Sequence, residues 1–556
     1  MKKLFAILSF MSFSVQAQNL YISDGTSFNI KRTSSVVISG ALKNKGSFTL
    51  NSDSNEYASV IVGSENNESE FNSTPIVYNR YVNEAGSGEW DLVGSPLELQ
   101  SISSFATSNA TNEILDTSGV YYALGTYDNS AGAWTNYTTP DSGLASSVSS
   151  AGNFDIGKGY QAGTLSGGGL LKFIGTAAAD HQTQSIQYNV ANDLGGSRWN
   201  LIANPFPSYI KANTHAHSTN NFLTVNNSDI QRPSNITIPS RIDPNFLAIY
   251  GWESDTNGDN TGAYTIYNFI DSEPLYIAPG QGFFIAANPN LNDTDFFPDA
   301  TDRVISFTKE MRTIVGGDDF IAGRMMNPTS SEFLLKLYEE DTFINSTRFY
   351  FDNGLTLGMD PGYDAGAFEQ DFGLMSRLPE SDQGIGLAIN AMGLEAFNAI
   401  SIPLEVYQVS NVPFRISLED STIASDIEVQ LEDRLLETLT LLNDEDFTLT
   451  AEEDLSGIGR FYLHLGNVTL GDNTFIQDLV SIYKGINDNY ITLEGLPYNT
   501  KNNLNVYNVL GQLVLSNVLE ANQTRQTVST KGLPSGIYLV ELQSGRSILS
   551  KKIIVK

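Results

Sequence analysis

The chain has 556 residues and no cysteine, which excludes disulfide bonds and a lipid-modified N-terminal cysteine. Its 63 acidic residues outnumber its 31 basic ones, and the net charge of −32 disfavours nucleic acid and anionic membrane surfaces as partners. The length allows several domains with their own cores, and 25 tyrosines with 30 phenylalanines favour β-rich globular domains over disorder.

The first 17 residues have the three parts of a secretory signal peptide. Lys2 and Lys3 precede an apolar run over residues 4–15, and Ala17 precedes the expected cleavage site before Gln18. The run is too short to span a bilayer, and no later stretch reaches about 18 uninterrupted apolar residues. The sequence therefore predicts a secreted chain without a transmembrane segment.

Residues 18–75 predict a β-rich segment made of very short strands. Mostly apolar triplets recur at a spacing of about ten residues, with Asn, Gly or Ser between them, which is typical of stacked strands in a β-solenoid or a meander. The triplets are residues 28–30, 36–38, 48–50 and 60–62. Four triplets are few for a free-standing solenoid, so we expect this segment to cap the domain that follows.

Residues 76–185 and 186–307 predict two copies of one β-repeat module, because four landmarks recur in the same order. The landmark pairs are IVYN (76–79) with IQYN (186–189), GEWDLVGSP (88–96) with SRWNLIANP (197–205), GAWTNY (132–137) with GAYTIY (262–267), and IGKGY (156–160) with PGQGF (279–283). Trp90 and Trp199 occupy equivalent positions, each in an expected strand that a proline ends. We predict that both indoles are largely buried and that the landmarks are framework.

Two landmarks also have chemical interpretations. The Gly-x-Gly pieces lack the third glycine and the following helix of a phosphate-binding loop, so nucleotide binding is disfavoured. The aromatic pairs Trp134/Tyr137 and Tyr264/Tyr267 could stack on sugar rings if exposed, although such pairs are more often cross-strand or core contacts.

Residues 308–477 predict a further β-sandwich of about eight strands, because short apolar or alternating runs recur along this stretch. Catalytic motifs are scarce throughout the chain. The four histidines offer few general bases, and no Gly-x-Ser-x-Gly elbow is present. His215 and His217 form the sole close histidine pair, without a third ligand nearby in the sequence.

The most specific candidate for a cofactor is calcium at Asp255, Asn257 and Asp259, whose side-chain oxygens recur at every second residue. The twelfth position is Ile266 rather than Glu, which excludes an EF-hand. A solvated turn is the alternative interpretation. A second acidic loop contains Asp293, Asp295, Asp299 and Asp302.

The last stretch, residues 478–556, alternates apolar and polar residues in strands separated by hairpin breaks, which predicts a small antiparallel sandwich. Its strings VYNVLGQLV (506–514), LPSGIYLVEL (533–542) and KKIIVK (551–556) stand in one order. That order resembles the C-terminal sorting domain of cargo proteins of the type IX secretion system, a Gram-negative export route across the outer membrane. The residues that carry the resemblance are Tyr507, Gly511, Gln512, Pro534, Gly536, Tyr538, Lys551 and Lys552.

The resemblance implies that the type IX translocon and its sorting protease are partners. It also implies passage through the periplasm to the exterior of the outer membrane. Residues 76–307 and 308–477 are similar to modules of proteins exported by the same system, which have no assigned chemistry. The sign of the net charge changes at the start of the sorting domain. Residues 18–477 hold 58 acidic and 21 basic residues, whereas residues 478–556 hold five acidic and eight basic residues.

Together these observations predict an all-β protein of several β-sandwich or β-rich domains in tandem, ending in a small immunoglobulin-like sorting sandwich. We expect a secreted, surface-attached or released protein without catalytic activity, acting in adhesion or as an envelope component. The alternatives are a secreted glycan-active enzyme and a carbohydrate-binding protein, because abundant carboxylates allow an acid pair that is close only in space.

Overall fold

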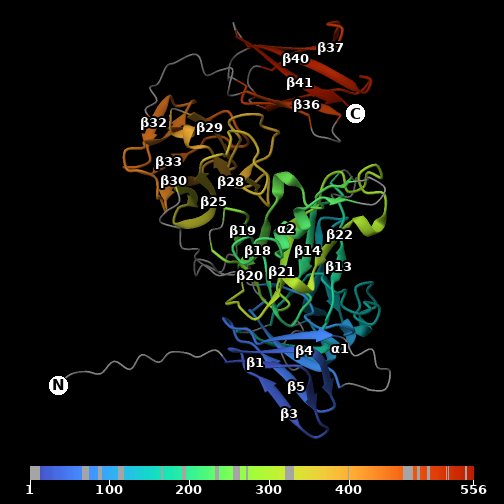
Figure 1. The fold of residues 1–556 in the computed structure, drawn as a ribbon. Helices are drawn as coiled ribbons and strands as arrows, with labels where there is room; N and C mark the ends of the chain where they lie inside the picture. The colour runs from blue at the N-terminus through green and yellow to red at the C-terminus, as the bar shows by residue number, and fades with distance from the viewer. Residues whose placement is uncertain are drawn as a thin grey trace, which may run out of the picture. The chain divides into compact units, whose positions relative to one another are not determined.

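A computed structural model describes residues 13–64, 74–85, 90–110, 118–164, 167–190, 196–231, 237–253, 263–270, 273–319, 331–398, 400–466, 480–484, 489–496, 501–520, 523, 525–544 and 547–555 (Figure 1). The protein is all-β, as predicted. It divides into two compact units, one of residues 1–243 with 248–324 and one of residues 244–247 with 325–556. Among the described residues, no helix has the length and apolar character needed to cross a membrane.

The first unit begins with short strands that stack in parallel. They are β1 (Phe13–Ala17), β2 (Leu20–Ile22), β3 (Ser27–Ile30), β4 (Ser34–Asn44), β5 (Ser47–Asn51) and β6 (Ser59–Ser64). The parallel pairings β1–β4–β6, β2–β4 and β3–β5 are those of a solenoid, since a meander would pair its strands antiparallel. The stack continues into the first module, because β5 also pairs in parallel with β7 (Ile76–Val82).

Strand β1 consists of the last five residues of the predicted signal peptide. Cleavage before Gln18 would therefore remove β1 and leave that side of β4 open to solvent. The signal peptide stays a prediction, and its residues 1–12 lie outside the described part of the chain.

The two modules contain four-stranded sheets of the same topology. The first is built from β8 (Asp91–Val93), β9 (Tyr121–Asp128), β10 (Ala133–Thr138) and β11 (Tyr160–Ala162), and the second from β14 (Trp199–Ala203), β18 (Ile249–Glu253), β19 (Ala263–Tyr267) and β21 (Gly282–Ala286). The strand orders are β10-β9-β11-β8 and β19-β18-β21-β14, which coincide when the copies are aligned by their landmarks. A short helix follows the first strand in each, α1 (Ile102–Ser108) and α2 (Phe222–Asn227).

The equivalent tryptophans differ between the copies. Trp199 lies in β14, is 8% exposed, and packs edge-on against Tyr250 with a centroid distance of 4.6 Å. Trp90 directly precedes β8 and is partly buried, so the prediction that it lies within a strand is wrong for this copy. The strand register places Gly125 where the second copy has Tyr250, so the first copy has no ring at that position.

The remaining strands of the first unit extend or connect these sheets. They are β12 (Gly169–Gly175), β13 (Gln182–Ser185), β15 (Tyr209–Lys211), β16 (Ile230–Gln231), β17 (Thr237–Ile238), β20 (Tyr276–Ile277), β22 (Val304–Phe307) and β23 (Arg312–Thr313). β23 pairs with β15, and Arg312 Nη1 donates to the Val62 carbonyl at 2.9 Å. Residues 308–324 therefore belong to the first unit rather than to the sandwich domain assigned from the sequence.

The second unit opens with eleven described strands in one connected sheet, where the sequence predicted about eight. They are β24 (Ser331–Glu339), β25 (Thr342–Phe351), β26 (Ala365–Gly366), β27 (Leu374–Ser376), β28 (Leu387–Met392), β29 (Ile400–Val406), β30 (Pro413–Glu419), β31 (Val429–Asp433), β32 (Thr438–Leu441), β33 (Phe447–Thr450) and β34 (Phe461–Leu465). They enclose one apolar core that includes Phe333, Phe349, Leu404 and Phe461. We call residues 331–466 the sandwich domain.

The sorting domain ends the second unit as two packed sheets. Its strands are β35 (Ser481–Tyr483), β36 (Tyr490–Glu494), β37 (Asn502–Asn508), β38 (Leu513–Leu519), β39 (Arg525–Ser529), β40 (Gly536–Ser544) and β41 (Ser547–Val555), drawn in red at the C-terminal end in Figure 1. The sheets have the orders β35-β36-β39 and β38-β37-β40-β41. Leu493, Leu504, Val506 and Val540 belong to one buried core that joins the two sheets.

Candidate functional site

The three sequence strings of the sorting domain meet in one row across its four-stranded sheet. Tyr507 of β37 pairs with Leu513 of β38 on one side and with Leu539 of β40 on the other. Leu539 in turn pairs with Lys552 of β41. Directly opposed residues of antiparallel strands point to the same face. Strings up to 45 residues apart in the sequence therefore form one continuous surface.

The hairpin turn between β37 and β38 explains two further motif residues. Gly511 has a φ of 74°, a left-handed conformation that glycine adopts without strain. Asn508 closes the turn, because its side-chain oxygen accepts hydrogen bonds from the backbone N–H groups of Leu510 and Gln512, each at 3.0 Å. The side-chain nitrogen of Asn508 donates to the Gln512 side chain at 2.8 Å. Gly511 and Gln512 are thus turn residues.

Pro534, Gly536 and Tyr538 fix the entry into β40. The Tyr538 hydroxyl donates to the Pro534 carbonyl at 2.7 Å, and its ring is buried in the domain core. Gly536 is the first residue of β40. Both motif segments lie at the same end of the sheet, since Asn508 pairs with Tyr538.

Lys551 and Lys552 lie on β41, an edge strand. A cavity of about 400 Å³ lies beside this edge. Its walls are residues 551–554 of β41, residues 482–484 at β35 and the loop 381–383 of the sandwich domain. Four consecutive residues of a strand alternate between its faces, so the cavity runs along the edge of β41 rather than over one face.

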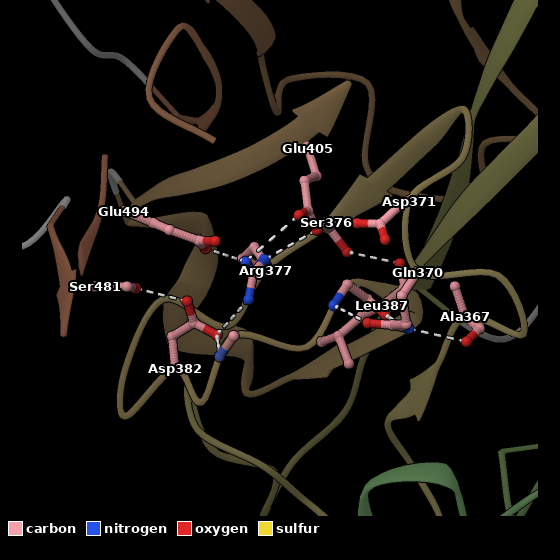
Figure 2. A network of polar contacts seen from close by, with 12 residues as sticks. Ala367, Gln370, Asp371, Ser376, Arg377, Asp382, Leu387, Glu405, Ser481 and Glu494 are labelled. Carbon is pink, nitrogen blue, oxygen red and sulfur yellow. Dashed lines mark hydrogen bonds and ion pairs between the residues drawn. The ribbon is translucent and has the colours of Figure 1, made fainter. Parts of the chain in front are cut away.

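A buried ionic network joins the sandwich domain to the sorting domain next to this cavity (Figure 2). The Arg377 side chain is 1% exposed, and its Nε donates to Glu405 at 3.0 Å. Its other nitrogens contact Asp382 at 3.4 Å and Glu494 of β36. Ser481 of β35 donates to Asp382 at 2.5 Å, which adds a second link between the two domains. We call this set of contacts the ionic joint.

The charges of the ionic joint perturb one another. Burial raises the pKa of Glu405 to about 7, although the positive charge of Arg377 opposes that shift. Burial alone would lower the pKa of Arg377, but Asp382, Glu405 and Glu494 raise it above its ordinary value. The guanidinium therefore stays charged among three carboxyl groups.

Packing on a glycine completes the ionic joint. Gly384 has a φ of 79°, and a Cβ there would lie 2.0 Å from the Tyr483 ring. The Arg377 guanidinium lies 6.0 Å from the centroid of the same ring. Sequence reasoning missed this joint. Its one available signal was an arginine enclosed by the apolar residues Leu374, Met375 and Leu378.

In the first unit, the landmark segments of one copy contact the landmark segments of the other copy and form a second joint. Val93 bridges Gln281, and the equivalent Ile202 bridges Lys158. The Gly94 N–H donates to the Gly280 carbonyl at 2.8 Å, and the equivalent Ala203 N–H donates to the Gly157 carbonyl at the same distance. The contacts are reciprocal, as in a two-fold interface. We call them the inter-copy joint.

The glycines of these landmarks are required by close contact. A Cβ on Gly159 would lie 2.5 Å from Leu201 Cγ, and one on the equivalent Gly282 would lie 2.7 Å from the Leu92 carbonyl carbon. Each Gly-x-Gly segment is thus shaped by the strand of the other copy. Gly157 and Gly280 have positive φ values of 78° and 64°.

The aromatic residues pair across strands, in combinations other than those expected. Trp134 packs edge-on against Tyr127, with centroids 5.4 Å apart, and Tyr264 against Trp252 at 4.9 Å. Phe284 contacts Tyr127 of the other copy at 5.1 Å. These rings therefore contribute to the packing of the two copies.

The predicted calcium ligands Asp255, Asn257 and Asp259 lie outside the described residues. Within the described ranges, no group of three or more His, Cys, Asp or Glu side chains is arranged to hold a metal ion. His217 Nδ1 accepts the backbone N–H of Asn220 at 3.0 Å and so closes a turn. Asp299 and Asp302 form a capping box on a short helical turn.

Two other buried polar groups lie away from the joints, and the sequence predicts a structural role for one of them, His464, in its aromatic strand. His464 is hydrogen-bonded to Ser401 at 2.7 Å and to Glu432 at 2.9 Å within the sandwich domain. In the first unit, the fully buried Arg80 donates to Asp319 at 2.9 Å. Burial raises the pKa of the nearby Asp91 to about 7. These contacts lie within cores and serve packing.

Comparisons with known proteins place most of the chain in one family. A family model described as "Domain of unknown function (DUF8693)" matches residues 5–464. A second, described as "Secretion system C-terminal sorting domain", matches residues 487–556, where the sequence predicted a sorting domain. No curated protein matches the chain.

Two solved structures are distantly similar. The crystal structure of dimeric latent PorU from Porphyromonas gingivalis is 12% identical, with 45% of this chain and 31% of that chain covered and a TM-score of 0.15. The crystal structure of a tetra-tandem repeat in the extending region of a large adhesion protein is 10% identical, with 78% and 90% covered and a TM-score of 0.11. At these TM-scores neither similarity assigns a fold or a function.

The strands of the sorting domain and its family match both indicate export. They confirm the predicted export through the type IX system to the cell surface or the extracellular space. The chain belongs to the family described as Domain of unknown function (DUF8693), and it is a cargo of the type IX secretion system that reaches the cell surface or the extracellular space.

Proposed function

We propose that residues 18–477 form a non-catalytic framework that acts outside the cell in adhesion or as an envelope component. The inter-copy joint is the observation that carries this proposal. The backbone groups and glycines of the segments that recur in both copies bond to and pack against the other copy. The recurrent motifs therefore hold the two copies together. Ligand contacts would then fall to the loops between landmarks, which vary freely on a rigid scaffold.

The charged groups of the second unit support the same proposal. Glu405 and Asp382 are engaged by Arg377, and Glu432 by His464 and Arg434. Burial would raise the pKa of Glu432, but these hydrogen bonds lower it. A glycosidase instead needs one carboxyl free to donate a proton and another free to attack or to activate water.

The test is a binding screen of the purified full-length protein against glycans and matrix proteins, paired with a turnover assay on the same glycans. We expect saturable binding without release of sugar. Catalytic release of reducing sugar would overturn the proposal in favour of a glycan-active enzyme. Binding to free glycans but to no matrix protein would favour the carbohydrate-binding alternative.

Calcium at Asp255, Asn257 and Asp259 remains part of the proposal, motivated by their alternate spacing. Millimolar calcium should raise the melting temperature by mass action, and Asp255→Ala with Asp259→Ala should abolish the rise. Titration calorimetry without heat would rule the site out.

A further inference from the structure

One face of the sheet β38-β37-β40-β41 is covered by the domain core, and the opposite face is apolar at one end. Val506, Val540 and Ile553 point into the core. The opposite face carries the cross-strand row of Leu513, Tyr507, Leu539 and Lys552, which we call the outward row. Ile537 and Ile554 form the next pair along the same face.

The apolar residues of the outward row are exposed to an unusual degree. Leu513 and Leu539 of the row are 55 and 46% exposed, Ile554 of the next pair is 57% exposed, and Leu510 in the adjoining turn is 79% exposed. A soluble protein rarely leaves a contiguous cluster of large apolar side chains in solvent unless another surface covers it. Solvation of this face therefore costs free energy that burial against a partner would recover.

The other end of the same face has a different character. There Asn503 pairs with Val518 and Gln543, and Gln543 pairs with Ile548. Val518 and Ile548 are as exposed as the outward row, at 59 and 50%, but two amides separate them. The continuous apolar surface is thus confined to the end of the sheet where the three sorting strings meet.

We propose that the outward row is the surface by which the sorting domain docks onto the export machinery, and that its partner there is an apolar surface with an acidic margin. Lys552 ends the row, and Lys551 precedes it on the same edge strand. Residues 478–556 carry eight basic and five acidic residues, against 21 and 58 in residues 18–477. A negatively charged margin would attract residues 478–556 and repel residues 18–477, and this would orient the cargo as it approaches.

The charge also decides between this partner and a second copy of the chain. Two molecules with a net charge of −32 repel each other, and two basic tails repel each other at the contact. Self-association through the outward row is therefore disfavoured, and the occupant is a different protein of opposite charge.

The experiment expresses the full-length protein in a bacterium with an active type IX system and compares two double variants. Leu513→Asn with Leu539→Asn removes the centre of the outward row. Val518→Asn with Ile548→Asn makes the same chemical change at equally exposed positions of the same face. Cell fractionation and immunoblotting measure the ratio of surface to periplasmic protein.

We expect the first variant to lose about tenfold in this ratio, which corresponds to about 1.4 kcal/mol of docking free energy, and the second to match the wild type. Thermal unfolding of both purified proteins should match the wild type, because all four side chains are exposed. Equal export of both variants, or equal loss in both, would overturn the proposal.

Two further measurements test the chemistry of the partner. Lys552→Glu should slow export, whereas Lys531→Glu, an exposed lysine outside the outward row, should not. Size-exclusion chromatography of the wild-type protein should give a monomer. A dimer that Leu513→Asn with Leu539→Asn dissociates would assign the outward row to self-association and overturn the proposal.

Discussion

The inter-copy joint and the ionic joint hold neighbouring parts of the chain together by different physical means. The inter-copy joint is made of backbone hydrogen bonds and glycines that allow close approach, so it is neutral and short-ranged. The ionic joint is centred on one buried guanidinium among three carboxyl groups. Buried charges depend on partners and on pH, whereas backbone contacts do not.

This difference suits the parts that are joined. The two copies belong to one permanent framework, for which a neutral joint is sufficient. The sorting domain is a signal for export, and its link to the sandwich domain depends on charged partners whose protonation can change. The two joints can be distinguished by substitution and by pH.

The largest effect is expected from Arg377→Met. Removing the cation leaves Asp382 and Glu405 buried without its compensation, while Glu494 keeps only its contact with Arg525. This should cost about 3–5 kcal/mol of unfolding free energy. Hydrogen exchange of β27 and β36 in the full chain measures this locally. The control is Arg525→Met, because Arg525 contacts Glu494 at 2.7 Å but is 53% exposed. It should cost about 1 kcal/mol or less. Equal losses in both variants would contradict an ionic joint.

Trp199→Ala should cost about 3 kcal/mol of unfolding free energy, since it empties a buried site beside Tyr250. Trp90→Ala should cost less, about 1 kcal/mol, because that indole is only partly buried. Chemical denaturation followed by tryptophan fluorescence compares the two. A larger loss from Trp90→Ala would mean that the copies do not differ as the structure indicates.

Gly280→Ala tests the inter-copy joint directly. The new Cβ would lie 2.6 Å from the Gly94 carbonyl oxygen, in addition to straining a φ of 64°. We expect a loss of about 2 kcal/mol of unfolding free energy. Gly152→Ala separates the two causes, because Gly152 has a φ of 74° and open space around it. It should lose about 1 kcal/mol from strain alone. If both variants lose the same amount, close contact at Gly280 is unimportant.

The smallest effect is a pH dependence of the ionic joint. The pKa of Glu405 rises from 4.5 to about 7 on folding, so the folded state binds the proton more tightly than the unfolded state. This stabilisation is complete below the unfolded pKa and is lost as pH rises through the folded pKa. The melting temperature of the second unit should therefore fall between pH 5 and about pH 8.

Glu405→Gln provides the control for this pH dependence. Burial also raises the pKa of Asp364, in the same unit, to about 7, so part of the fall will persist in the variant. The difference between wild type and Glu405→Gln isolates the contribution of the joint. Parallel melting curves across the pH range would show that Glu405 does not titrate with folding.

The sequence alone determined the features that depend on near neighbours. Alternating residues predicted the strands β37 and β40, and the Gly511-Gln512 break predicted the hairpin between β37 and β38. The order of the landmarks predicted two equivalent modules, and the strand orders of the two sheets coincide. Periodicity and turn chemistry act within a few residues, so they can be read without knowing the fold.

The tertiary structure alone decided which surfaces meet. Arg377 and Glu494 are 117 residues apart, and nothing local to either indicates the other. The partner of each Gly-x-Gly segment is the other copy, and Trp199 is buried more deeply than Trp90 because its cross-strand neighbour is Tyr250 in place of Gly125. Such contacts depend on how whole sheets pack, because the free energy of burying a charge or a ring is set by the neighbour that packing supplies.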